Sequence, residues 1–297
     1  MGSKVWKLGI VGWPLGYSLS PKMHNAALKA AGLQGEYREY PVPAEGLWMW
    51  LSRVTELGLD GFNVTMPYKK SVFSWVIGEW KGQLGRLEEL SGVIGALNTV
   101  VMRDGHPYGY NTDGEGFLQT LTQPPRSLDL SGWHVVLLGA GGAAQAIAVA
   151  LALRTRVKRL TLWNRHLSGA EKLRQLLEPL QAQGRTRVEV EVREELDELP
   201  LAECQMVVQA TPAGMKGQRD LALDYSRLRQ GQTVYDIVYE PRETRLIQEA
   251  RRRGCTVVTG DEMLAGQGAA AFEIWTGVKG MLPVMKQALD GDFAGRS

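Results

Sequence analysis

The chain has 297 residues, a length at which two domains are more common than a single hydrophobic core. Hydrophobic residues make up 44% and charged residues 22%, and the formal net charge of +2 results from 34 basic and 32 acidic side chains. This balance gives no strong positive field, so it argues against nucleic acid or a membrane surface as a partner. The densest basic run, 251–253, ends a charged helical segment that we interpret as a solvent-exposed face.

Two cysteines, Cys204 and Cys255, lie in apolar segments, which indicates reduced thiols in a cytoplasmic protein. The four histidines are too scattered for metal-ligand spacing, so we expect no metal. Residues 1–7 show no signal-peptide pattern. The uncharged run 135–153 is long enough to raise the question of a membrane span, but its glycines and Gln145 favour a strand, a turn and a buried helix.

The N-terminal half alternates between predicted strands and helices. A strand at 7–12 leads through a proline-containing loop to a helix at 22–31, for which Ser20 is the predicted N-cap and Pro21 the first-turn residue. The elements expected next are a strand at 36–42, a helix at 46–57, an extended segment ending at 66–67, a helix at 69–77 and a strand at 95–101. Such alternation indicates an α/β domain.

Two polar segments in this half follow predicted strands. Ser18 and Ser20 precede a helix, where backbone N–H groups and the helix dipole favour an anion such as a carboxylate. Segment 63–70, NVTMPYKK, combines an amide, a hydroxyl and two ammonium groups at a turn set by Pro67. From spacing alone, two alternatives stay open. Ser20 can be only a helix cap with Ser18 a loop residue, and segment 63–70 is more often a solvent-exposed strand end with surface lysines.

The second half contains a dinucleotide-binding pattern. A strand at 134–138 and a helix at 145–153 flank a glycine-rich turn of Gly139, Ala140, Gly141, Gly142, Ala143 and Ala144. This G-x-G-x-x-A form has the strand–turn–helix setting of the Rossmann fingerprint. The next strand, 159–163, is followed by Asn164, Arg165 and His166, without an acid for the ribose hydroxyls. Because a guanidinium can pair with a 2′-phosphate, we predict NADP rather than NAD.

The remaining elements fit a doubly wound sheet. A helix is expected at 168–183, and apolar strands are expected at 203–210, 233–239 and 255–258. Parallel strands need long crossover connections, and this spacing supplies them. The last segment, 263–289, is predicted to be a helix broken by Gly266, Gly268, Gly277, Gly280 and Pro283.

Several stretches together resemble the shikimate dehydrogenase family. They occur in the family's order across most of the chain, as SLSPKMHN at 18–25, NVTMPYK at 63–69, GALNT at 95–99, NTDG at 111–114, GAGGA at 139–143, NR at 164–165, ATP at 210–212 and GQG at 266–268. Each is weakly specific alone, whereas the ordered set is highly specific. The resemblance implies reversible, NADPH-dependent reduction of 3-dehydroshikimate to shikimate in aromatic amino-acid (chorismate) biosynthesis.

Matched position by position, the resemblance implies a catalytic pair and two binding sets. Lys69 and Asp113 are the implied acid–base pair, and the resemblance selects Lys69 over Lys70, which spacing alone does not. The implied substrate ligands are Ser18 and Ser20 for the carboxylate, Tyr239 near that end, and Asn63, Thr65, Asn98 and Gln267 for the ring hydroxyls. The implied cofactor residues are Gly139, Ala140, Gly141, Gly142, Ala143, Asn164, Arg165, His166, Thr211, Pro212, Gly260 and Met263.

The implied architecture is α/β with two domains. Residues 1–112 plus 264–297 would form a substrate-binding catalytic domain, and residues 113–263 would form a Rossmann-type NADP domain with a doubly wound parallel sheet. The C-terminal helices would return to the first domain. The expected partner is a small-molecule substrate, with a second copy of the chain in a homodimer as a further candidate.

Four positions depart from the family's pattern. Tyr17 stands where histidine is common, Gln209 replaces an asparagine, His166 replaces a threonine, and Gly169 occupies a place that often carries a second arginine. With one arginine, we expect a modest preference for NADP. Two alternatives remain: a quinate/shikimate dehydrogenase with relaxed cofactor use, and a catalytically silent, nucleotide-sensing regulator on the same fold, which would not need both members of the acid–base pair.

Overall fold

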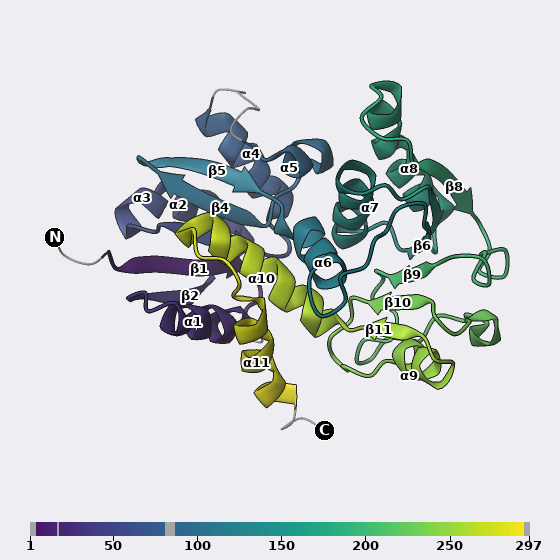
Figure 1. Cartoon of the computed structure of the whole chain (residues 1–297). Coiled ribbons are helices and arrows are strands. Elements are labelled where there is room, and N and C mark those ends of the chain that lie inside the picture. The colour runs from purple at the N-terminus through teal and green to yellow at the C-terminus, as the bar shows by residue number, and fades with distance from the viewer. Residues whose placement is uncertain (1–3, 17, 81–86, 294–297) are drawn as a thin grey trace. The chain divides into compact units, whose positions relative to one another are not determined.

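The computed structural model describes residues 4–16, 18–80 and 87–293. The chain divides into two compact units, of which the first comprises residues 1–116 and 265–297 and the second residues 117–264 (Figure 1). Tyr17, one of the departures from the family pattern, lies outside the described residues. The predicted two-domain α/β class is confirmed, including the return of the C-terminal helices to the first unit.

A five-stranded mixed sheet forms the centre of the first unit. In spatial order its strands are β2 (Gly35–Pro41), β1 (Trp6–Gly12), β3 (Gly61–Val64), β4 (Thr99–Arg103) and β5 (His106–Tyr110). β1 pairs in parallel with β2 and β3, whereas β4 pairs antiparallel with β3 and β5. Because the chain places β2 and β3 on opposite sides of β1, the carboxyl ends of β1 and β3 mark a topological switch point, where open α/β sheets bind ligands.

Helices cover both faces of this sheet. They are α1 (Ser20–Ala30), α2 (Leu47–Ser52), α3 (Val54–Leu57), α4 (Lys69–Glu79), α5 (Glu89–Ile94) and the C-terminal α10 (Gly260–Thr276) and α11 (Leu282–Phe293), of which α11 packs on α1. Alternation along β3 separates the two faces. Phe62 and Val64 join a core with residues of α2, α3 and α4, whereas Asn63 points toward Tyr37 on the other face.

The helix expected at 46–57 is present but interrupted at Arg53: a 3-10 turn, Ala44–Gly46, leads into the two short helices α2 and α3. Two other predictions of local structure in this unit are wrong. Ser20 is the first residue of α1 and not its N-cap; Leu19 occupies the N-cap position, with dihedral angles of −85° and −4°. Gly266 and Gly268 do not break α10, which runs through both of them.

The glycines of α10 serve close packing instead. A Cβ added at Gly266 would lie 2.6 Å from the carbonyl oxygen of Gly116, and one added at Gly268 would lie 2.6 Å from Met23 Cε. A Cβ at Gly116 would in turn lie 2.2 Å from the backbone nitrogen of Gln267. Backbone therefore contacts backbone where α10 crosses α6 (Thr112–Thr122), and no larger residue fits at this crossing.

The second unit contains a six-stranded parallel sheet. Its spatial order is β8 (Glu189–Arg193), β7 (Arg159–Trp163), β6 (His134–Leu138), β9 (Met206–Gln209), β10 (Thr233–Asp236) and β11 (Thr256–Val258). Helices α7 (Gly142–Arg154), α8 (Leu167–Ala182) and α9 (Arg245–Arg252) lie between strands in the chain. Counted from β6, this is the 3-2-1-4-5-6 order of the Rossmann fold, with its switch point between β6 and β9.

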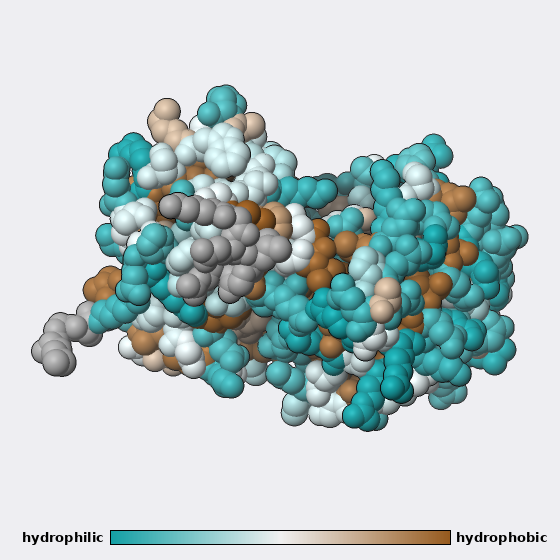
Figure 2. Space-filling model, turned by 90° about the horizontal axis from the view of Figure 1, so that it is seen from above, coloured by the Kyte–Doolittle hydropathy of each residue, from teal (hydrophilic) through white to brown (hydrophobic). Residues whose placement is uncertain are grey.

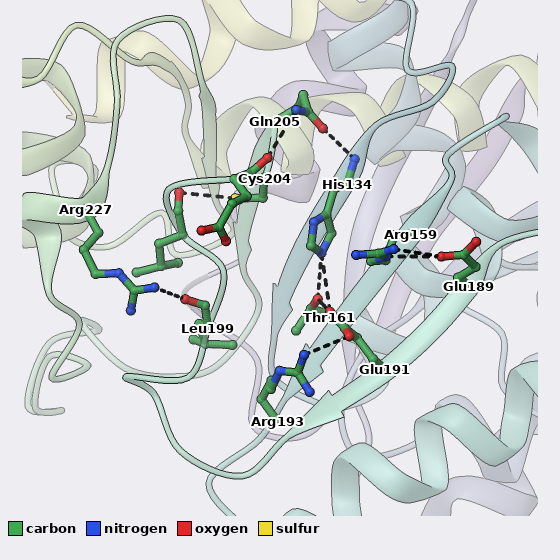
Figure 3. Close-up of polar contacts among 12 residues, drawn as sticks. His134, Arg159, Thr161, Glu189, Glu191, Arg193, Leu199, Cys204, Gln205 and Arg227 are labelled. Carbon is green, nitrogen blue, oxygen red and sulfur yellow. Dashed lines mark hydrogen bonds and ion pairs between the residues drawn. The ribbon is translucent and has the colours of Figure 1, made fainter.

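A row of polar side chains crosses three strands of this sheet (Figure 3). His134 Nε2 lies 2.7 Å from Thr161 Oγ1, and Thr161 donates to Glu191 Oε1 at 2.5 Å. Arg193 pairs with Glu191 at 2.9 Å, and Arg159 pairs with another glutamate of β8 at 3.1 Å. Burial and the charge of Arg159 lower the pKa of His134. These contacts link β6, β7 and β8 side by side.

Hydrophilic residues cover most of the face shown in Figure 2. Among the residues that the structure describes, no helix is both long enough and apolar enough to span a bilayer. The uncharged run 135–153 forms β6, a turn and the buried helix α7, as predicted.

Candidate functional site

Lys69 and Asp113 form a close ion pair in the first unit. Lys69 is the first residue of α4, directly after the turn at Pro67, and Asp113 lies in the first turn of α6. Lys69 Nζ donates to Asp113 Oδ2 at 2.5 Å, and the two side chains are 27% and 12% exposed. Lys70 is exposed, and its side chain contacts no partner among the described residues. The pair is thus partly shielded from water yet open to a small molecule, as proton transfer requires.

Asn98 fixes the other oxygen of the carboxylate. Its Nδ2 donates to Asp113 Oδ1 at 2.7 Å, while its Oδ1 accepts from the backbone N–H of Thr112 at 2.8 Å and from Thr99 Oγ1 at 3.0 Å. Asn98 is only 3% exposed, so water competes little for these bonds. Both oxygens of Asp113 are therefore held by protein groups.

Asn63 and three residues absent from the sequence-based prediction extend this network. Asn63 Nδ2 donates to the carbonyl oxygen of Asn98 at 3.2 Å and to Thr99 Oγ1 at 3.0 Å, and Asn63 Oδ1 accepts from the Tyr37 hydroxyl at 2.7 Å. Tyr37, Thr99 and Thr112 were missed. Thr99 and Thr112 lie inside the stretches GALNT and NTDG, which were a usable signal, whereas Tyr37 lies in an alternating strand with none.

Ser18, Ser20 and Thr65 lie where β1 and β3 end. The two strand ends meet, because the Thr65 backbone N–H donates to the carbonyl oxygen of Val11 at 3.0 Å. Ser18 Oγ accepts from the backbone N–H of Ser20 at 3.2 Å, which ties the two serines together at the start of α1. Within the described part of the chain, the Thr65 hydroxyl has no hydrogen-bond partner.

The last two predicted substrate residues belong to different units. Gln267 lies on α10, where this helix crosses α6 at Gly116. Gly116 lies about one helical turn after Asp113 on α6. Tyr239 belongs to the second unit, where it follows β10 and is 37% exposed. Burial of part of its ring raises the pKa of Tyr239. The first unit therefore contains every predicted catalytic and substrate residue except Tyr239.

The turn after β6 has the geometry of an anion cradle. Gly139 has φ of +113°, and a Cβ there would lie 2.6 Å from the carbonyl oxygen of Ala210, so only glycine fits. At Gly141 and Gly142 an added Cβ would meet no atom within 4 Å. The helix α7 begins here, and no side chain of the described residues caps its amino end. Open space beside uncapped backbone N–H groups fits a pyrophosphate.

Asn164, Arg165 and His166 follow β7 at the same edge of the sheet. Asn164 Nδ2 donates to the carbonyl oxygen of His166 at 2.9 Å. Arg165 is exposed and makes no ion pair or hydrogen bond with any described residue. A Cβ at Gly169 would lie 2.5 Å from Asn164 Nδ2, so a second arginine would displace Asn164. The guanidinium of Arg165 is therefore exposed and unpaired among the described residues.

Gln209 braces the loop that begins with Thr211 and Pro212. Gln209 Oε1 accepts from the Thr211 N–H at 2.7 Å, and its Nε2 donates to the carbonyl oxygens of Thr211 and Ala213 at 3.1 and 2.9 Å. Gln209 is only 2% exposed. The departure from asparagine at this position thus places a longer amide that holds the loop at three points.

Gly260 and Met263 lie in the first turn of α10. A Cβ at Gly260 would lie 2.2 Å from the carbonyl oxygen of Ile237, so the helix starts in backbone contact with the segment after β10, and Met263 is 7% exposed. The end of β10 contains the buried Asp236, which accepts from Thr244 Oγ1 at 2.7 Å. Burial raises the pKa of Asp236 to about 6.

Comparison with known families gives matches at both ends of the chain. Residues 10–100 match the shikimate dehydrogenase substrate binding domain, and residues 260–289 match the shikimate 5′-dehydrogenase C-terminal domain. A shikimate dehydrogenase (NADP(+)) of Symbiobacterium thermophilum is 41% identical over 286 residues, which cover 95% of this chain and 92% of that protein.

Solved structures with the same fold include enzymes for three substrates. A ligand-free 5-ketofructose reductase of Gluconobacter has a TM-score of 0.86 at 32% identity, covering 98% of this chain and 100% of that one. A shikimate dehydrogenase in complex with NADP⁺ has a TM-score of 0.83 at 34% identity, covering 99% of both chains. A quinate dehydrogenase from Corynebacterium glutamicum in complex with NAD has a TM-score of 0.82 at 32% identity, covering 96% and 99%.

Proposed function

The chain belongs to the shikimate dehydrogenase family, and on that premise we propose that it catalyses the reversible, NADPH-dependent reduction of 3-dehydroshikimate to shikimate in aromatic amino-acid biosynthesis. The observation that carries this proposal is the 2.5 Å contact between Lys69 Nζ and Asp113 Oδ2. An enzyme that oxidises a secondary alcohol needs such a pair, because the hydroxyl proton must leave as the carbonyl forms. A silent regulator would not need it.

We assign proton transfer to the Lys69–Asp113 pair as a unit. In the direction of shikimate oxidation, the pair takes the hydroxyl proton, and in the reverse direction it returns the proton to the carbonyl oxygen. Asn98 holds Asp113 in the orientation that presents Oδ2 to Lys69. The NADP cofactor, when bound, supplies the acceptor or donor of the hydride.

Most of the proposed substrate residues contact the substrate directly, and one acts through a neighbour. Ser18 and Ser20 bind the carboxylate, with Tyr239 at that end of the substrate. Thr65, Asn98 and Gln267 bind the ring hydroxyls, and the unpartnered Thr65 hydroxyl supports its part. Because both Asn63 amide hydrogens and its oxygen are already engaged, we assign Asn63 to holding Asn98 rather than to direct contact.

The cofactor residues follow from the geometry of the second unit. The turn from Gly139 to Ala143 and the first turn of α7 hold the pyrophosphate, as the open space at Gly141 supports. Arg165 pairs with the 2′-phosphate, with Asn164 and His166 beside it. Thr211, Pro212, Gly260 and Met263 complete the cofactor side.

One experiment tests this function and its nearest competitors. Shikimate and quinate are each offered with NADP and with NAD, 5-ketofructose is offered with NADPH, and the reduced cofactor is followed by absorbance. We expect the highest kcat/KM with shikimate and NADP. A higher kcat/KM with quinate and NAD, or with 5-ketofructose, would replace the proposal with the activity named for those relatives. No turnover with all three substrates would favour the regulator.

We also propose that the protein is cytoplasmic and homodimeric. Two free thiols, Cys204 and Cys255, support a reducing compartment. Trp48 and Met49 on α2 are 56% and 68% exposed, and this apolar surface supports coverage by a second copy. Sedimentation equilibrium of the wild type and of Trp48→Glu tests the dimer: a wild-type monomer at micromolar concentration would contradict it.

A further inference from the structure

Tyr37 lies in β2 and is contacted by two residues of α1, His24 and Asn25. It is 1% exposed, and the ring of His24 stacks on it with the centroids 4.3 Å apart and the planes 7° apart. Asn25 brackets the backbone of the same residue: its Oδ1 accepts from the Tyr37 N–H at 2.8 Å, and its Nδ2 donates to the Tyr37 carbonyl oxygen at 3.0 Å. A tyrosine clamped in this way has a fixed hydroxyl position.

The hydroxyl of Tyr37 contacts the network that leads to the proposed acid–base pair. It donates to Asn63 Oδ1 at 2.7 Å. Burial raises the pKa of Tyr37 well above its ordinary value, so the phenol is neutral and keeps the proton that this bond needs. Asn63 in turn contacts Asn98, which holds Asp113.

The donor at Tyr37 decides which way the Asn63 amide points. With its oxygen facing the phenol, Asn63 directs both N–H bonds toward the Asn98 carbonyl oxygen and Thr99 Oγ1. A flipped amide would place its oxygen against the Asn98 carbonyl oxygen, and like-charged acceptors repel in a buried site. Thr99 and Asn98 pass this orientation on to Asp113, through bonds of 3.0 and 2.7 Å.

We propose that Tyr37 is a positioning residue for the reaction proposed above, on which this inference rests. Its hydroxyl orients the Asn63 amide, and through Asn98 it fixes the carboxylate of Asp113. Tyr37 itself acts through these side chains without touching the substrate.

The test substitution is Tyr37→Phe, which keeps the ring that stacks on His24 and removes the donor alone. Removing the donor to a buried acceptor costs a free energy equivalent to about a tenfold change in a rate or an equilibrium constant. We therefore expect kcat to fall about tenfold and the KM for shikimate to rise at least about threefold. The KM for NADP should stay within about twofold. A rise in one KM separates the positioning role from a simple loss of folded protein, which would lower kcat alone.

Tyr40→Phe is the matched control. Tyr40 lies in the same strand, its ring contacts Trp50, and its hydroxyl makes no hydrogen bond with a described residue. We expect its kcat, both KM values and its melting temperature to match those of the wild type. An equal loss of activity in both variants would overturn the assignment, because removing any hydroxyl from β2 would then have the same effect.

A second readout does not depend on turnover. In protein labelled with ¹⁵N-asparagine, exchange of the Asn63 side-chain amide protons with water reports whether both N–H bonds are held. We expect exchange at least about tenfold faster in Tyr37→Phe and unchanged in Tyr40→Phe. If the wild type fails to oxidise shikimate, the proposed function fails, and exchange at Asn63 decides the positioning role by itself. Unchanged exchange in Tyr37→Phe overturns the inference.

Discussion

Replacing Lys69 with alanine removes the ammonium group and leaves the rest of the acid–base site in place. Asp113 Oδ2 loses its 2.5 Å partner, while Oδ1 keeps the 2.7 Å bond from Asn98. Loss of general acid–base catalysis typically costs about 10²–10⁴-fold in rate, which corresponds to roughly 3–5 kcal/mol in the barrier. Because the lysine side chain is 27% exposed, the folded state should lose only about 1 kcal/mol.

The assay separates chemistry from binding. Initial rates of NADP reduction with shikimate give kcat, and calorimetric titration of shikimate into the variant gives its dissociation constant. We expect kcat to fall at least about a hundredfold while shikimate still binds, since the proposed carboxylate and ring ligands remain.

Lys70→Ala is the control for Lys69→Ala, since both lysines lie in the first turn of α4 and only Lys69 contacts Asp113. Its kcat should stay within about twofold of the wild type. Near-full turnover in Lys69→Ala, or an equal fall in both variants, would refute the assignment of the acid–base pair.

Four further predictions address the cofactor site and pH. Gly141→Ala adds a methyl group where no described atom lies within 4 Å, so the melting temperature should stay unchanged while the KM for NADP rises at least about tenfold. Gly139→Ala adds a methyl group at a φ of +113° and 2.6 Å from a carbonyl oxygen, so it should lower the melting temperature itself. Arg165→Ala should raise the KM for NADP at least about tenfold and leave that for NAD within about twofold, and equal effects on both would contradict the 2′-phosphate role. Burial lowers the pKa of His24 from an ordinary 6.5 to about 3. Between pH 6.5 and about pH 3, the His24 imidazole is therefore protonated in the unfolded chain and neutral in the folded one. Each pH unit of acidification in that window then costs about 1.4 kcal/mol of stability, a slope that His24→Phe should remove in urea titrations. Burial raises the pKa of Asp236 from 3.8 to about 6, which has the opposite sign in that window, so Asp236→Asn should steepen the loss on acidification.

The elements predicted best from the sequence are those whose environment is uniform. β6 and β7 match their predicted ranges at both ends, because each is a short apolar run buried in the parallel sheet and bounded by turn residues. The start of α4 at Lys69 was likewise predictable from the proline turn before it. Local signals and tertiary packing agree in these segments.

The errors arise where a residue has a tertiary role that contradicts its local tendency. From the local sequence, Gly266 and Gly268 were predicted to break the helix. In the structure they allow α10 to pack closely, because a Cβ at either position would clash with Gly116 or Met23. The engaged amide of Asn63 was equally out of reach, because its partner Tyr37 lies 26 residues away on another strand. The contact between Lys69 and Asp113 spans 44 residues, and only the family resemblance indicated it beforehand.

Asn25 also protects an exposed edge of the first unit. β2 is an outer strand of its sheet, and outer strands offer unpaired backbone groups that another chain can extend. At the middle of β2, the Asn25 side chain occupies both the N–H and the carbonyl oxygen of Tyr37. An incoming strand would have to displace this amide before it could pair there. The clamp on Tyr37 therefore also blocks intermolecular sheet growth at the middle of β2.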